Sequence, residues 1–530
     1  MRPSNFSFIV FPFLIIFFSL CSNISFSKDN DYDRVGLSSG ERQIFYHLPE
    51  GSERYPYIFL VAMEQPGQGI PFNENLERFG FIPDPDNKNG LPIGLTVEDR
   101  QDGKGPLVGI TCAGCHVGEI RYEGQVVRLD GAPSMVDFQR FSIEMGQTAI
   151  WTTQNQDALD RFAAKASAIC SQTGSKNCSA EIMIAGLQKY AELVEQSGKI
   201  FNRVFPAQGF GYGRADAFGA ARNLIWGSLD PETNLRIANA SLSYPHIWGI
   251  DNTEWLHWNS NTTSVMERNI GQALGVGGFV DLAPGENQFR SSINLRNLHI
   301  LELFSYKLAP PPWPEKILGE INKEKATRGK ILYSQHCQNC HATSLPAQMT
   351  DYPLFSLEAI GTDPTYAINF NQPILSNGGT NIKVGSFAES IEFLMKNVKE
   401  RAYIDQGISA EEASDFEHGR EDILWRSNLA YPARHLAGIW GTAPYLHNGS
   451  VPTMFDLLLP VNQRPKQFPV GHYEYDPVKL GYRTDIKDGD PEFRSMFDVS
   501  NPGDSNVGHL YGTELEDEER WDLLEYIKTL

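Results

Sequence analysis

The chain has 530 residues, of which 41 % are hydrophobic and 21 % are charged, an ordinary composition for a globular protein. A chain of this length can bury large cores and form more than one domain. Its formal net charge of −20 excludes a general nucleic-acid binder, because phosphate backbones are bound by basic surfaces. Such acidity keeps a protein in solution or steers a basic partner toward it.

The N-terminus has the pattern of a secretory signal peptide. Arg2 precedes a 13-residue apolar run from Phe8 to Leu20, and small residues lead to Ser27. The run is shorter than the roughly 20 apolar residues that span a bilayer, which disfavours an uncleaved anchor helix. We therefore predict a signal peptide at residues 1–27, no stable membrane anchor after cleavage, and a periplasmic or secreted bacterial protein.

Two copies of Cys-x-x-Cys-His carry the clearest chemistry, one at 112–116 and one at 337–341. This pentad is the attachment signature of c-type haem: two thiols add to the haem vinyl groups, and the histidine binds the iron. A thioredoxin-like redox pair and half of a zinc site are the alternatives for a single copy. Both copies carry the histidine and lie far apart in the chain, which favours two covalently bound haem c groups. The predicted attachment residues are Cys112, Cys115, His116, Cys337, Cys340 and His341.

Cys170 and Cys178 are a second pair of cysteines, outside both pentads. They are separated by seven polar or small residues, including Gly174, which suits a turn. Exported proteins occupy oxidising compartments, where disulfides form and persist. We predict a local disulfide between them.

The proline-rich segment 309–314 predicts a stiff linker between the two pentads. It separates a predicted N-terminal haem domain, 28–308, from a C-terminal cytochrome c domain, 315–530. The N-terminal part contains a long insertion rich in aromatic residues and glycine, 201–278. Four of the nine tryptophans lie in this insertion: Trp226, Trp248, Trp255 and Trp258.

Two helical patterns in the C-terminal part resemble the crossing terminal helices of a cytochrome c domain. One runs from Lys325 to His336, and the other occupies the last residues from Glu516. We expect Gly329 to permit the close approach, with Tyr333 and Tyr526 packed at the crossing.

Three segments resemble the bacterial dihaem cytochrome c peroxidase superfamily and its haem rubber-oxygenase branch. Segment 438–453 (GIWGTAPYLHNGSVPT) resembles the superfamily hallmark, while 91–96 (LPIGLT) and 128–133 (RLDGAP) are more similar to the rubber oxygenases. The resemblance implies a mostly α-helical protein with two cytochrome-c-like haem domains. It also implies that one iron is the reaction site and the other an electron relay.

The resemblance also directs the search for iron ligands. His116 and His341 are the expected proximal ligands, and cytochrome c folds place the distal ligand in the loop before the last helix. Here that loop holds His509 and no methionine, so we expect His509 to complete the second haem, with His447 as the alternative. We expect His435, His472 and His418 to be surface or hydrogen-bonded structural histidines.

No distal histidine or methionine stands out for the first haem, and an open position is what dioxygen or peroxide requires. The aromatic insertion is expected to flank this haem. Its loose candidates are Phe210, Tyr212, Arg214, Trp248, Trp255, His257 and Trp258. Each of them alone is more often a core residue than a catalytic one.

These observations predict an oxidoreductase that activates peroxide or dioxygen at the first haem, with the second haem as electron relay. A peroxidase and an oxygenase of an apolar substrate remain open alternatives, and the substrate is unidentified. The expected partner is a redox protein such as a small cytochrome. The alternative from another class is a dihaem electron carrier without a substrate.

Overall fold

The structure is a computed structural model that describes residues 36–99, 105–173, 178–206, 209–418, 420 and 423–530. The predicted signal peptide, 1–27, lies outside the described residues. Within the described residues, no helix combines the length and the apolar character that a membrane crossing requires.

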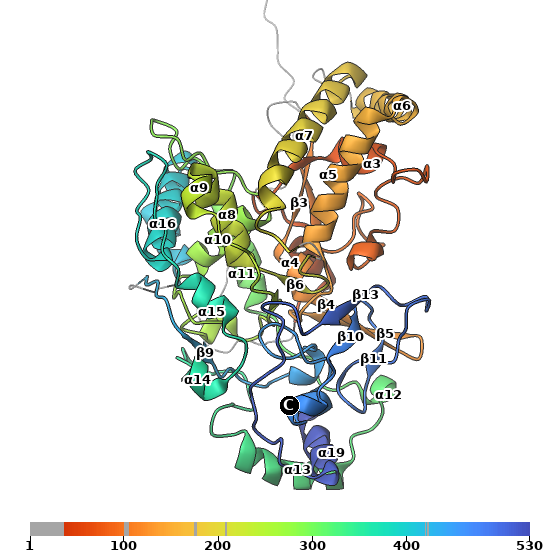
Figure 1. The fold of residues 1–530 in the computed structure, drawn as a ribbon, viewed down its shortest axis with the longest axis vertical. Coiled ribbons are helices and arrows are strands. Elements are labelled where there is room, and N and C mark those ends of the chain that lie inside the picture. Colours follow the sequence, from red (N-terminus) through yellow and green to blue (C-terminus); the bar gives the residue numbers. More distant parts are fainter. Residues whose placement is uncertain (1–35, 100–104, 174–177, 207–208, 419, 421–422) are drawn as a thin grey trace, which may run out of the picture.

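The fold mixes helices with small sheets (Figure 1). The helices are α2 (Ser39–His47), α3 (Tyr57–Ala62), α4 (Cys112–His116), α5 (Phe138–Gln154), α6 (Gln156–Thr173), α7 (Ala180–Phe201), α8 (Ala217–Leu229), α9 (Pro231–Asn234), α10 (Val265–Val276), α11 (Leu295–Ser305), α12 (Glu315–Leu318), α13 (Lys323–His336), α14 (Leu357–Ile360), α15 (Thr365–Phe370), α16 (Phe387–Asp405), α17 (Ala410–Phe416), α18 (Met454–Leu457) and α19 (Asp517–Ile527). Short 3₁₀ turns are η1 (Leu76–Phe79), η2 (Ile250–Asn252), η3 (Ile439–Gly441) and η4 (Val461–Gln463).

The strands are β1 (Tyr55–Pro56), β2 (Leu95–Glu98), β3 (Leu107–Ile110), β4 (Val117–Tyr122), β5 (Gln125–Asp130), β6 (Arg214–Ala215), β7 (Leu242–Ser243), β8 (Leu354–Ser356), β9 (Ala430–Pro432), β10 (Gln467–Val470), β11 (Tyr475–Asp476), β12 (Gly481–Tyr482) and β13 (Ser495–Asp498). They pair in antiparallel ladders, as one three-stranded sheet, β1-β3-β2, and several two-stranded ones. The expectation of a mostly α-helical protein is therefore confirmed only in part, because the fold mixes helix with sheet. The strands were missed because most of them are only two to four residues long and many pair across long loops. No alternating pattern therefore marks them in the sequence.

The first pentad forms α4 and runs directly into the β4–β5 hairpin. In that hairpin Val117 pairs with Asp130 and Tyr122 with Gln125, which fixes the register over the whole length of both strands. The backbone N–H of Gly131 then donates to the carbonyl of His116. The hairpin therefore holds the end of α4 in place.

The crossing of the terminal helices is confirmed in the C-terminal part, where α13 and α19 pack together at one end of the molecule (Figure 1). A Cβ atom on Gly329 would lie only 2.0 Å from the carbonyl oxygen of Asp522, so the two backbones touch where only glycine fits. The rings of Tyr333 and Tyr526 meet with their centroids 5.2 Å apart. The second pentad follows immediately after α13.

The largest hydrophobic cluster takes side chains from both sides of segment 309–314. It joins residues such as Leu129 and Trp248 to Trp440 and Leu523. Trp313, inside the segment, packs edge-on against Trp440 at 5.2 Å. The domain boundaries at this segment stay a prediction, and the packing shows that the two parts of the chain share one core.

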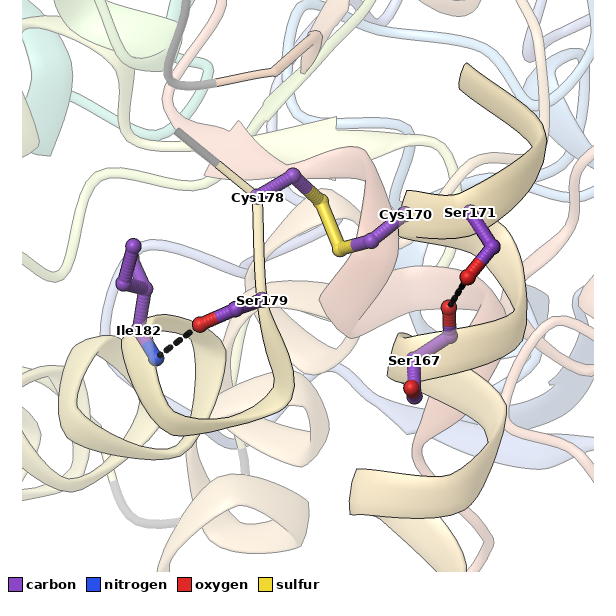
Figure 2. The surroundings of a disulfide bond; sticks show 6 residues. All are labelled: Ser167, Cys170, Ser171, Cys178, Ser179 and Ile182. Atoms are coloured by element: carbon purple, nitrogen blue, oxygen red, sulfur yellow. Dashed lines mark hydrogen bonds between the residues drawn. A yellow bond between two sulfur atoms is a disulfide. The ribbon is translucent and has the colours of Figure 1, made fainter. Parts of the chain in front are cut away.

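Helices α5, α6 and α7 stand together at the end of the molecule opposite α13 and α19 (Figure 1). The predicted disulfide is confirmed there: Cys170 in α6 is bonded to Cys178, just before α7. Figure 2 shows this bond beside the N-cap of α7, where the hydroxyl of Ser179 accepts from the N–H of Ile182 at 3.3 Å. The bond therefore closes a short loop between two packed helices.

Replacing both Cys170 and Cys178 by Ala should lower the free energy of unfolding by about 2 to 3 kcal/mol, because the short closed loop restricts the unfolded chain. Urea denaturation of the purified proteins measures this change. Ser171→Ala, on the exposed side of the same helix, is the matched control and should change stability by less than about 0.5 kcal/mol. Free alkylation of both cysteines in the native wild-type protein would show that they are unpaired.

Candidate haem centres

The first pentad presents its histidine in a form that can bind a metal. His116 is 3 % exposed, and its Nδ1 lies 2.9 Å from the carbonyl oxygen of Pro245. A carbonyl only accepts, so Nδ1 carries the proton and Nε2 keeps its lone pair. Burial, followed by the charge of Arg268, lowers the pKa of His116 to about 3, which keeps the ring neutral. Cys112 and Cys115 are both unbridged thiols.

The second pentad repeats this arrangement. His341 Nδ1 lies 2.6 Å from the carbonyl oxygen of Arg434, and burial lowers the pKa of the imidazole. The turn is closed by backbone bonds from Cys340 and His341 to the carbonyl of Cys337. Cys337 and Cys340 are also unbridged thiols.

The two carbonyls that hold these histidines belong to two similar segments. Residues 245–250 read Pro-His-Ile-Trp-Gly-Ile, and residues 434–439 read Arg-His-Leu-Ala-Gly-Ile. In each, the first residue accepts from a pentad histidine, and a glycine near φ +70° begins a 3₁₀ turn. This repeated His-x-x-Gly-Ile pattern is a signal that sequence reasoning missed.

The similar segments also pack against each other. The rings of His246 and His435 have centroids 4.9 Å apart, and His435 Nε2 lies 3.1 Å from the carbonyl oxygen of Trp248. A Cβ atom on Gly438 would lie 2.7 Å from the Trp248 ring, so the segments meet too closely for a larger residue. His435 was expected to be structural, and it is a buried residue at the contact between the two similar segments.

His509 is placed opposite the second pentad. Its ring centroid lies 6.3 Å from that of His341, and burial lowers its pKa to about 4. Within the described residues, its Nδ1 has no hydrogen-bond partner. Imidazole–metal bonds of about 2.0 Å on both sides of one ion place two ring centres roughly 6 Å apart. The spacing of the two rings therefore fits one iron between them.

His447, the alternative ligand, makes different contacts. Its ring stacks on Tyr431 with centroids 4.3 Å apart, and burial lowers its pKa to about 4. Its carbonyl accepts from the N–H of Ser243. These contacts place His447 in the packing between β7 and β9.

The donor sets fit haem c at both pentads. Each has two free thiols on one turn, and each has a neutral histidine whose outer nitrogen is tied to a carbonyl. His116 differs from His341, since among the described residues it has no ring contact with a second imidazole of the kind that His509 makes. The assignment of individual iron ligands stays a prediction.

The aromatic candidates are spread over different parts of the structure. Trp248 is fully buried, and its Nε1 donates to the carbonyl of Asp130 at 2.8 Å, next to the first pentad's hairpin. Trp258 donates to the carbonyl of Ser243 at 2.9 Å. The guanidinium carbon of Arg426 lies 3.4 Å from the centre of the Trp255 ring. Of these three, Trp248 is the one that belongs to a similar segment, 245–250, and its ring lies against Gly438 of the other segment.

His257 and the other residues of the insertion have structural partners. His257 Nδ1 lies 2.6 Å from Oδ1 of Asn261, and burial lowers its pKa to about 3. The Tyr212 hydroxyl donates to the carbonyl of Arg78 at 2.6 Å. Phe210 is buried against Phe205. These side chains support the packing around the first pentad.

Arg214 is a buried tie between the two parts of the chain. Its guanidinium donates to the carbonyls of Tyr212 at 2.8 Å, of Asn448 at 2.9 Å, and of Gly449. Burial lowers its pKa to about 10, and its charge lies 4.0 Å from the centre of the Phe497 ring. These three carbonyl bonds give Arg214 a structural role, and its part in catalysis stays a prediction.

Glu50 and Arg268 are polar groups beside the first pentad that sequence reasoning missed. Glu50 is fully buried, its Oε2 accepts from Cys112 Sγ at 3.3 Å, and its Oε1 has no partner among the described residues. Burial raises the pKa of Glu50 to about 8. Burial lowers the pKa of Arg268, and the charges of Cys112 and Glu50 act against this. Neither residue lies in a motif, since Glu50 precedes α3 and Arg268 is in α10.

Comparison with known proteins places these features in a family context. The family model described as RoxA-like, cytochrome c-like matches residues 430–469, which include Arg434, His435 and His447. The uncharacterized protein y4iJ of Sinorhizobium fredii is 32 % identical over 565 residues, covering 93 % of this chain and 92 % of the relative. The uncharacterized protein y4iM of the same strain is 26 % identical over 308 residues, covering 54 % of this chain and 63 % of the relative.

The two pentads and the segment that matches a cytochrome c-like family model imply covalently bound haem c. The match supports the rubber-oxygenase-like branch of the expected resemblance. Within this class, the chain belongs to the same family as y4iJ of Sinorhizobium fredii.

Replacing Arg214 by Met should lower the free energy of unfolding by about 3 kcal/mol or more, because three buried carbonyls lose their donor. Denaturant titration followed by tryptophan fluorescence measures the loss. Arg203→Met, at a mostly exposed position, is the control and should change stability by less than about 0.5 kcal/mol. Unchanged stability of Arg214→Met with a changed haem spectrum would contradict the structural role.

Proposed function

We propose that the protein is an exported dihaem c-type oxidoreductase that activates dioxygen or peroxide at the first haem and uses the second as an electron relay. The observation that carries the proposal is the difference between the two pentads. Both histidines are held through Nδ1 by a backbone carbonyl, and among the described residues His341, unlike His116, has a ring contact with a second imidazole, that of His509. A bis-histidine iron is suited to electron transfer, and an iron with one open position can bind an oxidant.

The haem groups supply the redox chemistry when bound, and the chain sets their surroundings. The carbonyls of Pro245 and Arg434 keep the protons of His116 and His341 at Nδ1, so that Nε2 points to the metal. A fixed proton position also fixes the orientation of each ring. The two metal positions are thereby set relative to the backbone of the two similar segments.

The contact between these segments supports a relay. His246 follows Pro245 directly, His435 follows Arg434, and the two rings are 4.9 Å apart. Trp248 stacks on His246 at 5.4 Å. A short path therefore joins the two pentad histidines: a hydrogen bond at each end, the backbone of each segment, and the ring contact between His246 and His435.

At the first pentad, Glu50 is proposed to hold and release a proton, and Arg268 to stabilise negative charge. A carboxyl group with a pKa raised to about 8 can hold a proton near neutral pH and release it during a reaction. The buried positive charge of Arg268 would stabilise an anionic oxygen species nearby.

The oxygenase form of the proposal has the better support. The matched family description is RoxA-like, and the surroundings of the first pentad are rich in buried aromatic residues such as Trp248 and Tyr212. The identity of the substrate is left open.

The proposed setting is the periplasm or the exterior of a bacterial cell, with a redox protein as partner. The disulfide between Cys170 and Cys178 supports an oxidising compartment. The net charge of −20 would favour a basic partner such as a small cytochrome.

His509→Ala should convert one haem from low spin to high spin, because the second iron loses its sixth ligand. Absorption and electron paramagnetic resonance spectra of the purified oxidised protein measure the change. His447→Ala is the matched control and should leave the spin states as in the wild type. The reverse pattern would assign the second iron to His447.

Reduced wild-type protein should bind one carbon monoxide per chain, at the first haem, and His509→Ala should bind two. The first haem should be reoxidised rapidly by dioxygen or peroxide, with the second haem oxidised in the same reaction. Stopped-flow absorbance spectroscopy follows both steps. Two low-spin haems that bind no carbon monoxide would contradict the proposal and favour a simple electron carrier.

A further inference from the structure

Three potential metal ligands meet away from both pentads. His299 and Glu302 lie three residues apart in α11, which places them on one face of the helix. His418 comes from the chain just after α17, beyond the proline-rich segment. One ligand atom from each residue lies within 4.8 Å of the others.

The carboxylate of Glu302 is buried and only half satisfied. Its side chain has 0 % exposure; Oε1 accepts from the Tyr306 hydroxyl and lies 2.8 Å from His418 Nε2. Its second oxygen, Oε2, has no partner among the described residues. A buried carboxylate oxygen without a donor or a cation is costly.

His299 has a matching unpaired atom. Its Nδ1 is buried without a hydrogen-bond partner in the described part of the chain. Its ring lies 5.2 Å from that of His418 and 4.7 Å from that of Phe416. Burial lowers the pKa of His299, so the neutral ring can offer a lone pair to a metal.

We propose that His299, Glu302 and His418 form a binding site for one divalent metal ion, with Zn²⁺ as the best-fitting ion. Two imidazoles and one carboxylate are a known zinc ligand set, which leaves a fourth position for water. A small ion among the three groups would use the free Nδ1 of His299 and the free Oε2 of Glu302 together.

A simple ion pair between His418 and Glu302 explains less of the arrangement. The pair accounts for Oε1, and it leaves Oε2 and His299 Nδ1 buried and unpaired. A cation accounts for all three groups.

The site would link the two parts of the chain. Glu302 is in α11, before segment 309–314, and His418 follows it in sequence by more than a hundred residues. The charge of Glu302 also acts on Arg268, beside the first pentad. A bound ion would therefore hold His418, just after α17, against α11.

The test uses the full-length, haem-loaded protein. It is stripped with a chelator, dialysed against Zn²⁺ alone and analysed by inductively coupled plasma mass spectrometry. We expect one zinc per chain in addition to the haem iron, and a higher melting temperature than in the stripped protein. X-ray absorption at the zinc edge should show nitrogen and oxygen ligands, including imidazole, and no sulfur.

Glu302→Gln and His299→Gln should each weaken zinc binding by about 100-fold or more, since each removes a direct ligand. His47→Gln is the matched control, because His47 is a half-buried histidine paired with Asp84 at 2.8 Å and is not part of the cluster; its zinc content should equal that of the wild type. Absence of zinc in the wild type, sulfur ligands at the zinc edge, or full zinc content in both ligand variants would overturn the proposal. If a variant fails to fold, the zinc content of the wild type and its X-ray absorption at the zinc edge still decide the test.

Discussion

The structure depends on two hydrogen bonds in which a backbone carbonyl accepts from the Nδ1 of a pentad histidine. The carbonyls are those of Pro245 and Arg434, far from His116 and His341 in sequence. Each bond fixes both the tautomer and the orientation of an imidazole, as a metal ligand requires. The supporting segments must therefore be held rigidly, and most of the surrounding packing does this.

The two supports are rigid because they are packed on each other. Gly249 and Gly438 adopt the left-handed backbone conformation, and Gly438 also lets the Trp248 ring come into contact with the backbone. Arg214 donates to the carbonyl of Tyr212, before segment 309–314, and to that of Asn448, after it. The largest hydrophobic cluster likewise includes residues from before and after this segment. In consequence the geometry at one pentad is mechanically connected to the geometry at the other. The His299–Glu302–His418 cluster would add one more link across the same division.

Some expectations depended on local patterns and others on tertiary contacts. The α13–α19 crossing was predictable because it recurs in cytochrome c domains. Gly329 and Tyr333 lie one turn apart in α13, and both contact Tyr526 of α19. The expectation of a mostly helical fold missed the strands because short ladders such as β6–β7 pair residues nearly thirty positions apart and leave no periodic signal. Arg214 was a candidate for catalysis from the sequence, and only the tertiary structure shows its three buried carbonyl partners.

The sequence by itself determined the chemistry that is encoded by closely spaced residues: the two pentads and the cysteine pair of the disulfide. These features are readable because their function requires a fixed spacing along the chain. Only the tertiary structure decided which distant groups surround them, including the carbonyls of Pro245 and Arg434, the buried Glu50 and the contact between His246 and His435. The physical reason is that burial and hydrogen-bond partners arise from the packing of segments that lie 62 or more residues apart in these contacts, and no local pattern records that packing.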